Sequence, residues 1–408
     1  MAPKNNHLVA LDIGTSSISA AIAELREGQT PHLIGIGTTP SRGLRKGVVI
    51  NIEATVESIR RAVEQAETMA GIQANSVFAS ISGSHIQGLN SNGIVGIRNK
   101  EVSHYDIEKV IDAAKAVAIP LDREVLHVLP QEFIIDNQDG IREPLGISGV
   151  RLEARVHIVT GSVASAQNVV KCANRCGLTV KDIVLSPLAA SASVLSDEER
   201  ELGVALVDIG GGTTDIIVYH GGSVRHTAVL AVGGSHITND IAAGLRTPIG
   251  AAEDIKQRYA SAVADQNDGV STLEVASTGG RAPRILSQSM LGEIVEPRVQ
   301  EIFRLVKREL ERVGCVELLT SGIVLTGGSS RLKRIGEVAE SVFQLPVRIG
   351  EPTGISGVTD LIRGPEFSTV AGLILFSSRR QNFSNAYRGQ SVVGRTFRNV
   401  SNWLSEHF

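Results

Sequence analysis

A glycine-rich turn between two short β-branched runs, at residues 204–219, carries the residue types that bind phosphate. The flanking runs predict a β-hairpin with the glycines at its tip. Glycine leaves backbone N–H groups open to an anion, threonine adds hydroxyl donors, and the preceding Asp208 places a carboxylate where it could hold a metal-bound water. The turn alone is weak evidence, since most such turns bind nothing. The turn residues expected to contact phosphate are Gly210, Gly211, Gly212, Thr213 and Thr214.

The same pattern occurs near the start of the chain, where residues 9–22 place Asp12 at the end of an apolar run. Alignment of the two stretches matches Asp12 to Asp208, about one domain length apart. Two related halves, each with an aspartate and a phosphate-binding turn, predict a nucleotide held between two lobes. We expect Asp12 and Asp208 to hold magnesium through water, and Asp208 is also the candidate for positioning an attacking water. The first turn contributes Gly14, Thr15 and Ser16.

A third glycine pair follows the strand expected to begin at Val229. Gly233 and Gly234 end this strand just before a predicted helix, and that geometry aims helix N–H groups at an anion. We therefore expect both glycines to contact phosphate.

Three stretches, at residues 12–16, 208–215 and 323–331, resemble in order the two phosphate motifs and the adenosine motif of the actin, Hsp70 and sugar-kinase superfamily. The resemblance implies an α/β, actin-like fold of two lobes, with duplicated mixed sheets covered by helices, that binds ATP or ADP with Mg²⁺. It gives Glu253 and Lys256 contacts to ribose and adenine, although their spacing alone predicts an ordinary surface ion pair. The residues that it places around the adenine are Gly327, Gly328, Ser330 and Arg331, the last against the ring.

Composition excludes several other classes of protein. A formal charge of −3 and only 3% aromatic residues argue against a nucleic-acid partner. Three cysteines form no disulfide framework and favour a reducing cytosol. No apolar run approaches the roughly 18 residues of a spanning helix, and Asp12 interrupts the first apolar run, so neither a membrane span nor a signal peptide is expected.

Changes in composition and hydrophobic spacing along the chain divide it into four folded parts and a tail. Residues 85–161 read as a small α/β subdomain inserted into the first lobe, without a catalytic constellation. The expected parts are lobe I (1–84 with 162–198 and 362–376), the inserted subdomain (85–161), lobe II (199–228 with 311–361), the helical subdomain (229–310), a linker (377–391) and a terminal helix (392–408).

The terminal helix has the pattern of one that lies in a membrane interface. Residues 377–408 contain five arginines and one glutamate, a formal +4, and include the only tryptophan of the chain. Most terminal helices pack on their own domain, but the polar linker and the charge contrast favour anionic lipid here. The expected membrane-facing set is Val393, Arg395, Phe397, Arg398, Val400, Trp403, Leu404 and Phe408.

Over essentially its whole length the chain resembles the FtsA family of bacterial cell-division proteins, notably at residues 35–49, 233–240 and 321–328. The resemblance implies an ATP-binding protein that polymerises, tethers the ring protein FtsZ to the cytoplasmic face of the inner membrane at the septum, and recruits later division proteins. It implies that the FtsZ C-terminal peptide docks on the helical subdomain, and that the inserted subdomain contacts the filament neighbour and later division proteins.

Ser186 departs from the superfamily pattern at the position where Hsp70-type hydrolysers carry a water-orienting glutamate. A serine is not a strong base, so we expect slow hydrolysis at most. Three alternatives remain at this point: a pilus-assembly homologue of the PilM type, a sugar kinase, and an Hsp70 chaperone. A sugar kinase needs a further catalytic aspartate between the lobes, and a chaperone needs a substrate domain after residue 376.

Overall fold

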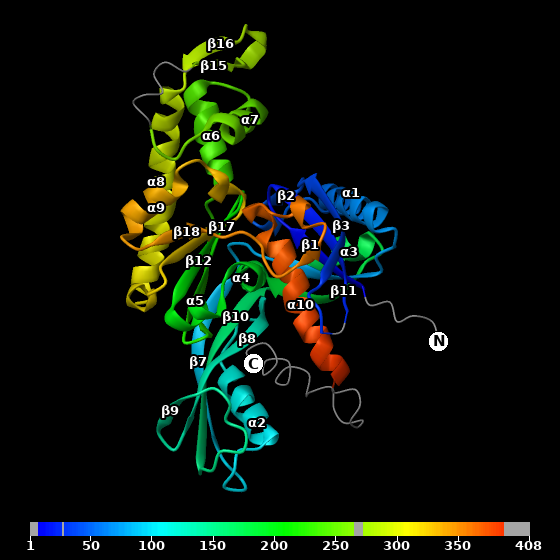
Figure 1. Ribbon diagram of the computed structural model, residues 1–408, viewed down its shortest axis with the longest axis vertical. Helices are drawn as coiled ribbons and strands as arrows, with labels where there is room; N and C mark the ends of the chain where they lie inside the picture. The colour runs from blue at the N-terminus through cyan, green and yellow to red at the C-terminus, as the bar shows by residue number, and fades with distance from the viewer. Residues whose placement is uncertain (1–6, 27, 265–271, 387–408) are drawn as a thin grey trace.

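Two lobes form the centre of the molecule, with one subdomain at each end of its long axis (Figure 1). The computed structural model describes residues 7–26, 28–264 and 272–386. Both lobes are built on the same plan, in which three antiparallel strands are joined by a fourth strand parallel to the first. The expected actin-like, two-lobed α/β fold with duplicated mixed sheets is confirmed.

The sheet of lobe I has the order β11-β6-β1-β2-β3-β19. Helices α1 (Ile52–Ala70) and α3 (Val163–Arg175) pack on one face, and α4 (Ser186–Val194) and α10 (Ser368–Ala386) pack on the other. The strands are β1 (His7–Ile13), β2 (Ser17–Glu24), β3 (His32–Pro40), β6 (Ser76–Ile81), β11 (Thr179–Leu185) and β19 (Ser356–Gly357). A small hairpin of β4 (Leu44–Arg45) and β5 (Val48–Val49) precedes α1.

The sheet of lobe II has the order β14-β13-β12-β17-β18. One face packs on α8 and α9, while the other face shares a hydrophobic core with α4 and α10, which therefore lie between the two sheets. The elements are α5 (Asp197–Leu202), β12 (Val204–Ile209), β13 (Thr214–His220), β14 (Ser223–Leu230), β17 (Ile323–Thr326), α9 (Ile335–Phe343) and β18 (Val347–Ile349).

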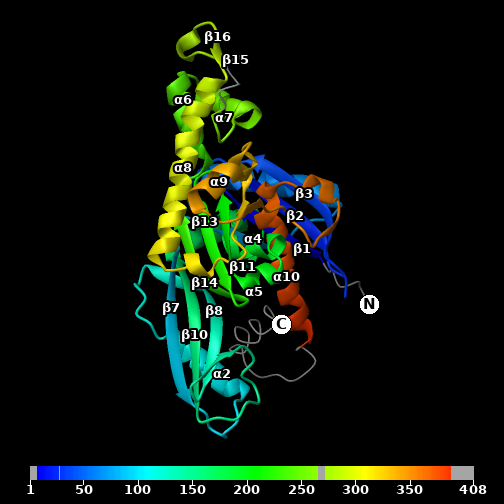
Figure 2. The ribbon, with the colours of Figure 1, turned by 60° about the vertical axis from the view of Figure 1, so that its left-hand side comes forward.

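The helical subdomain stands at one end of the molecule, and α8 runs from it along lobe II (Figure 2). Its elements are α6 (Gly234–Leu245), α7 (Ile249–Tyr259), β15 (Thr272–Val275), β16 (Arg284–Ser287) and α8 (Ser289–Arg312).

At the opposite end, the inserted subdomain is a sheet of order β7-β10-β8-β9 with α2 packed against it. Its elements are β7 (Gln87–Gly96), α2 (His104–Lys115), β8 (Arg123–Ile135), β9 (Gln138–Ile141) and β10 (Arg151–Ser162). Helical spacing at residues 106–117 predicts α2, and apolar runs at 125–130 and 151–159 predict parts of β8 and β10. The sequence analysis missed β7, because glycine and asparagine interrupt the apolar alternation in that strand.

Two expectations about helix ends are wrong. The helix that we expected to stop at Phe376 continues to Ala386, and Ser377 and Ser378 in it are buried, so the linker does not begin at residue 377. Ser186, followed by Pro187, has the sequence pattern of an N-cap, but the N-cap of α4 is Leu185 and Ser186 is the first helical residue. The expected terminal helix 392–408 lies outside the described residues. In the described part of the chain no helix is long and apolar enough to cross a membrane.

Although the chain connects the inserted subdomain to lobe I at both ends, the subdomain also packs on β14 of lobe II. His157 of β10 donates through Nδ1 to Asn90 Oδ1 at 2.6 Å, and its Nε2 accepts from the Thr227 hydroxyl of β14 at 2.8 Å. Gln131 of β8 donates to the Val224 carbonyl at 2.8 Å, and an Arg142–Glu201 ion pair joins the subdomain to α5. Polar and apolar contacts therefore fix this subdomain against both lobes.

His157 should make this joint sensitive to acid. Burial, together with the nearby His226, lowers the pKa of His157 to about 3 from 6.5. A lowered folded-state pKa gives stability that is present above pH 6.5 and is lost as the pH falls towards 3. Between pH 7.5 and 5.5 the expected loss from this group is about 1.4 kcal/mol.

Thermal unfolding at the two pH values checks this expectation. His157→Gln should remove that part of the pH dependence, while His104→Gln, at an exposed site on α2, should leave it in place. Equal pH dependence in the wild type and His157→Gln would contradict the assignment.

Candidate functional site

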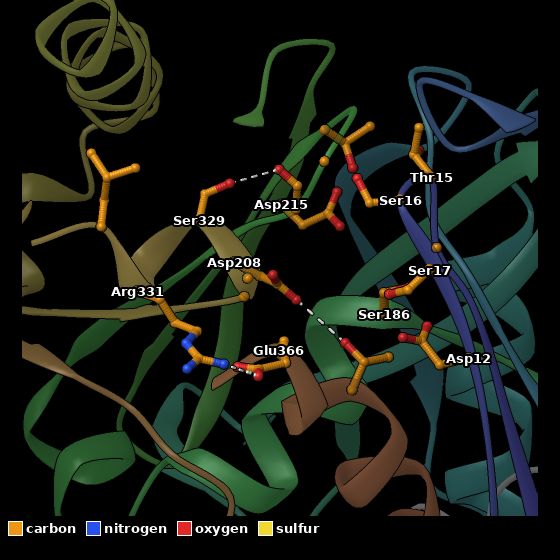
Figure 3. Close-up of a pocket in the computed structure, with 18 of the residues that line it drawn as sticks. Asp12, Thr15, Ser16, Ser17, Ser186, Asp208, Asp215, Ser329, Arg331 and Glu366 are labelled. Atoms are coloured by element: carbon orange, nitrogen blue, oxygen red, sulfur yellow. Dashed lines mark hydrogen bonds and ion pairs between the residues drawn. The ribbon is translucent and has the colours of Figure 1, made fainter. Parts of the chain in front are cut away.

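The two glycine-rich turns face each other across a cavity of about 660 Å³ between the lobes (Figure 3). Each turn is the tip of a hairpin, closed by a hydrogen bond from the glycine N–H that follows the first strand: Gly14 to Ser17, and Gly210 to Thr213. A Cβ atom on Gly211 would lie 1.8 Å from Ser16 Oγ, and one on Gly212 would lie 2.7 Å from Thr15 Oγ1. The glycines therefore allow the two turns to approach closely.

Three aspartates from three strands meet in this cavity. Asp12 and Asp208 are the last but one residues of β1 and β12, and Asp215 is paired with Asp208 across the hairpin register. Each accepts one side-chain hydrogen bond: Ser80 to Asp12 at 2.7 Å, Thr369 to Asp208 at 3.3 Å and Ser82 to Asp215 at 2.6 Å.

Burial makes these carboxylates unusually weak acids. It raises the pKa of Asp12 to about 6. Burial and the neighbouring charge of Asp12 raise the pKa of Asp208 to about 7. Burial and then Asp208 hold the pKa of Asp215 well above its usual value. Converging carboxylates that resist ionisation favour a bound cation, which would offset their mutual repulsion.

Within the described residues, no group of three acidic, histidine or cysteine side chains has the arrangement of a direct metal site. Asp12, Asp208 and Asp215 would fit a cation held through its water shell, as magnesium often is, because all three line the cavity beside the phosphate turns. Asp215 is not part of the cation site predicted from the sequence, which holds Asp12 and Asp208. The signal was present, because Asp208 and Asp215 flank the turn symmetrically and so face the same side of the hairpin.

Not every predicted phosphate contact lines the cavity. Gly234 and Ser235 donate their N–H groups to the Gly210 and Gly211 carbonyls at 2.9 and 2.7 Å, so Gly233 and Gly234 support the phosphate turn rather than face an anion. Thr214 is buried and donates to the Val232 carbonyl. The predicted residues that do line the cavity are Asp12, Gly14, Thr15, Ser16, Asp208, Gly210, Gly211, Thr213, Glu253, Lys256, Gly327, Gly328 and Arg331; those that do not are Gly212, Thr214, Gly233, Gly234 and Ser330.

On the far side of the cavity, Lys256 of α7 links several polar groups. Its Nζ donates to Glu253 Oε2 at 2.8 Å, Thr238 Oγ1 at 2.9 Å and the Gly234 carbonyl at 3.2 Å. Lys256 is therefore more than one half of a surface pair, and it ties α7 to the start of α6. This wall could hold the sugar of a nucleotide.

At the part of the cavity expected to hold adenine, Ser330 does not line the wall and Arg331 has an ionic partner. Ser330 is buried and donates to the Gly327 carbonyl at 2.7 Å. Arg331 forms an ion pair with Glu366, a residue just before α10, and Figure 3 shows the two side chains pointing toward one another. Gly327 has φ +83°, and a Cβ there would lie 2.2 Å from Asp208 Oδ1, so bare backbone is required at this point.

Comparison with known proteins identifies the family. The family profile described as "Cell division protein FtsA" matches residues 205–372, and the profile of the "SHS2 domain inserted in FTSA" matches residues 83–160. The chain is 53% identical over 408 residues to "Cell division protein FtsA" of Pseudomonas aeruginosa, covering 98% of both proteins. The chain belongs to the FtsA family. It is also 44% identical to the FtsA of Neisseria meningitidis over all of both chains, and 41% identical to that of Escherichia coli over 98% of both.

Solved structures show the same fold at low sequence identity. The "PilM-PilN type IV pilus biogenesis complex" has a TM-score of 0.64 at 18% identity and covers 90% of this chain and 97% of that chain. MreB5 of Spiroplasma citri bound to ADP has a TM-score of 0.56 at 16% identity, with 94% and 100% covered. The pilus-type alternative therefore shares the fold, while the closely related sequences place this chain among bacterial cell-division proteins.

Proposed function

We propose that this FtsA-family protein binds magnesium-ATP between its lobes and uses the bound state to form filaments. The observation that carries the proposal is the pair of phosphate turns beside three cavity carboxylates, of which Asp208 and Asp215 are buried and Asp12 is half-buried. Thr15, Ser16, Thr213 and the turn N–H groups would hold the phosphates, and Asp12, Asp208 and Asp215 would hold the hydrated cation. Magnesium bound there would neutralise the developing charge of the phosphates.

Slow turnover is expected from the same geometry. Ser186 stands at the cavity wall where a glutamate base would be needed, and the cavity carboxylates are engaged by Ser80, Ser82 and Thr369. ATP would serve mainly to hold the lobes together and favour the polymer. Pelleting of the full chain with Mg-ATP, with ADP and without nucleotide tests this; assembly that ignores nucleotide would contradict it.

The contact between the two turns gives a sharper test. Gly211→Ala should weaken Mg-ATP binding at least tenfold, because its methyl group would push the turns apart against Ser16. Gly250→Ala, at a glycine of α7 with no atom within 4 Å of its added methyl, is the matched control. Titration with a fluorescent ATP analogue measures both variants, and wild-type affinity in Gly211→Ala would show that the turns do not close on nucleotide.

We further propose that the protein tethers FtsZ filaments to the cytoplasmic face of the inner membrane at the septum. The FtsZ C-terminal peptide would dock on the helical subdomain, where Ile249, Tyr259, Ile285 and Met290 are exposed. Later division proteins and the filament neighbour would contact the inserted subdomain, where Ile94, Leu145 and Val150 are exposed. Binding of an FtsZ tail peptide, measured with Ile285→Lys and Ile94→Lys, separates the two surfaces; only the first should weaken it.

The sugar-kinase alternative gains one observation from the structure. Asp215 is a third carboxylate at the cavity, and the sequence analysis had found no such surplus group. Its carboxylate already accepts from Ser82, however, and the FtsA relatives span the whole chain. A sugar-dependent release of ADP would be needed to revive that alternative.

A further inference from the structure

Ser82 joins the nucleotide cavity to the inserted subdomain. It follows β6 of lobe I, lines the cavity, and donates to Asp215 Oδ1 of lobe II at 2.6 Å. Within the described residues this hydrogen bond joins a lobe I side chain directly to a cavity carboxylate of lobe II, and Thr369–Asp208 is a second, longer one at 3.3 Å. Ser82 also lies only five residues before β7, the first strand of the inserted subdomain.

The segment between Ser82 and β7 has the features of a pivot. Gly83 has φ +134°, a conformation that side-chain-bearing residues rarely adopt. A Cβ on Gly47, from the loop after β4, would lie 2.7 Å from the Gly83 Cα, and the Gly47 N–H donates to Thr15 Oγ1 of the first phosphate turn at 2.9 Å. Gly47 therefore contacts both the first phosphate turn and this segment, so a displacement of the turn would reach Gly83 through Gly47.

After Gly83, the inserted subdomain contacts β14, the strand that pairs with the Asp215 strand β13. A Cβ on Gly88 of β7 would lie 2.6 Å from Thr227 Oγ1 of β14, so the two strands are in close contact. β14 pairs with β13, and the register matches Asp215 to Val229. The contacts form a closed loop from Asp215 through Ser82, the pivot and β7 to β14, and back to β13.

We propose that Ser82 is a positioning residue that couples the occupied state of the nucleotide cavity to the orientation of the inserted subdomain. The inference rests on the proposed binding of nucleotide in that cavity. A hydrated cation and phosphates in the cavity would shift the Asp215 carboxylate. The Ser82 hydroxyl, which donates to it, would shift as well, and the backbone at Gly83 and β7 would move with Ser82. The inserted subdomain then presents its exposed surface in one orientation when the cavity is filled and in another when it is empty.

Hydrogen–deuterium exchange of the full chain, with and without saturating Mg-ATP, tests the coupling. In the wild type, nucleotide should change exchange both in the phosphate turns (12–16 and 208–214) and in β7 (87–96). Ser82→Ala should retain the change in the turns and lose at least most of the change in β7, and Ser82→Thr, which keeps the hydroxyl, should restore it.

Ser84→Ala is the matched control, because Ser84 lies at an exposed position of the same segment, two residues after Ser82. It should keep the change in β7. Coupling through Ser82 is wrong if β7 still responds in Ser82→Ala, or if β7 never responds while the turns of the wild type do. A wild type in which no segment responds to Mg-ATP contradicts the proposed nucleotide site itself, and the coupling with it.

Discussion

Asp208→Asn should unfold at a temperature several degrees higher than the wild type at pH 7.5 without ligand, and should gain almost no further stability from Mg-ATP. The reason is the raised pKa of Asp208, about 7 instead of 3.8. A raised folded-state pKa means that stability is fully present below pH 3.8 and is lost as the pH rises through 7. The cost at pH 7.5 is on the order of 3–4 kcal/mol.

An asparagine has nearly the same shape, can still accept from Thr369, and never ionises, so it removes this cost. It also removes a charge that would hold the cation. Wild-type protein with nucleotide at a hundred times its dissociation constant should gain about 2.7 kcal/mol, and the variant should not.

Differential scanning fluorimetry from pH 4 to 8, with and without Mg-ATP, measures both effects. The stability advantage of Asp208→Asn should disappear near pH 4, where the wild-type carboxyl is protonated. Asp254→Asn, at an exposed position of α7, should behave as the wild type throughout. A variant that keeps the full response to Mg-ATP would remove Asp208 from the cation site.

Removal of residues 392–408 should abolish co-sedimentation with anionic vesicles while leaving nucleotide-dependent pelleting intact. The expected binding energy of one tail is small. Because α10 extends to Ala386, Arg379 and Arg380 belong to that helix. The tail after it has three arginines and one glutamate, and its attraction to anionic lipid is about 2 kcal/mol.

Apolar burial adds to this attraction, but the entropy of ordering the segment offsets much of it. Firm attachment therefore requires many tails on one filament. Trp403→Glu should reduce vesicle binding at least tenfold in the presence of ATP, and the full chain should bind far more weakly without nucleotide. Binding of the truncated chain at the wild-type level would place the lipid contact elsewhere.

The sequence predicts the architecture well where the same residues determine both the backbone conformation and the binding chemistry. The aspartate–glycine turns need glycine for close approach, so their residue types reveal both the hairpins and their phosphate-binding use. Asp215 follows from hairpin symmetry and could have been assigned with the same reasoning.

Other features depend on tertiary contacts that no local pattern reports. The N–H groups after Gly233 have a helix-start pattern suited to anions, but those of Gly234 and Ser235 donate to the carbonyls of Gly210 and Gly211. The polar stretch after Phe376 contains serines that a linker would expose, yet packing against lobe I buries Ser377 and Ser378 within α10. The docking of the inserted subdomain on β14 joins residues about 70 positions apart, such as His157 and Thr227.

In the proposed membrane-bound state, the end of α10 limits how far lobe I can stand from a lipid surface. Only five residues separate Ala386 from the first residue of the expected terminal helix, and five residues reach at most about 18 Å when fully extended. So short a connection would leave each subunit little freedom to reorient relative to the bilayer. In the proposed membrane-bound filament, the α10 end of every lobe I would therefore face the bilayer.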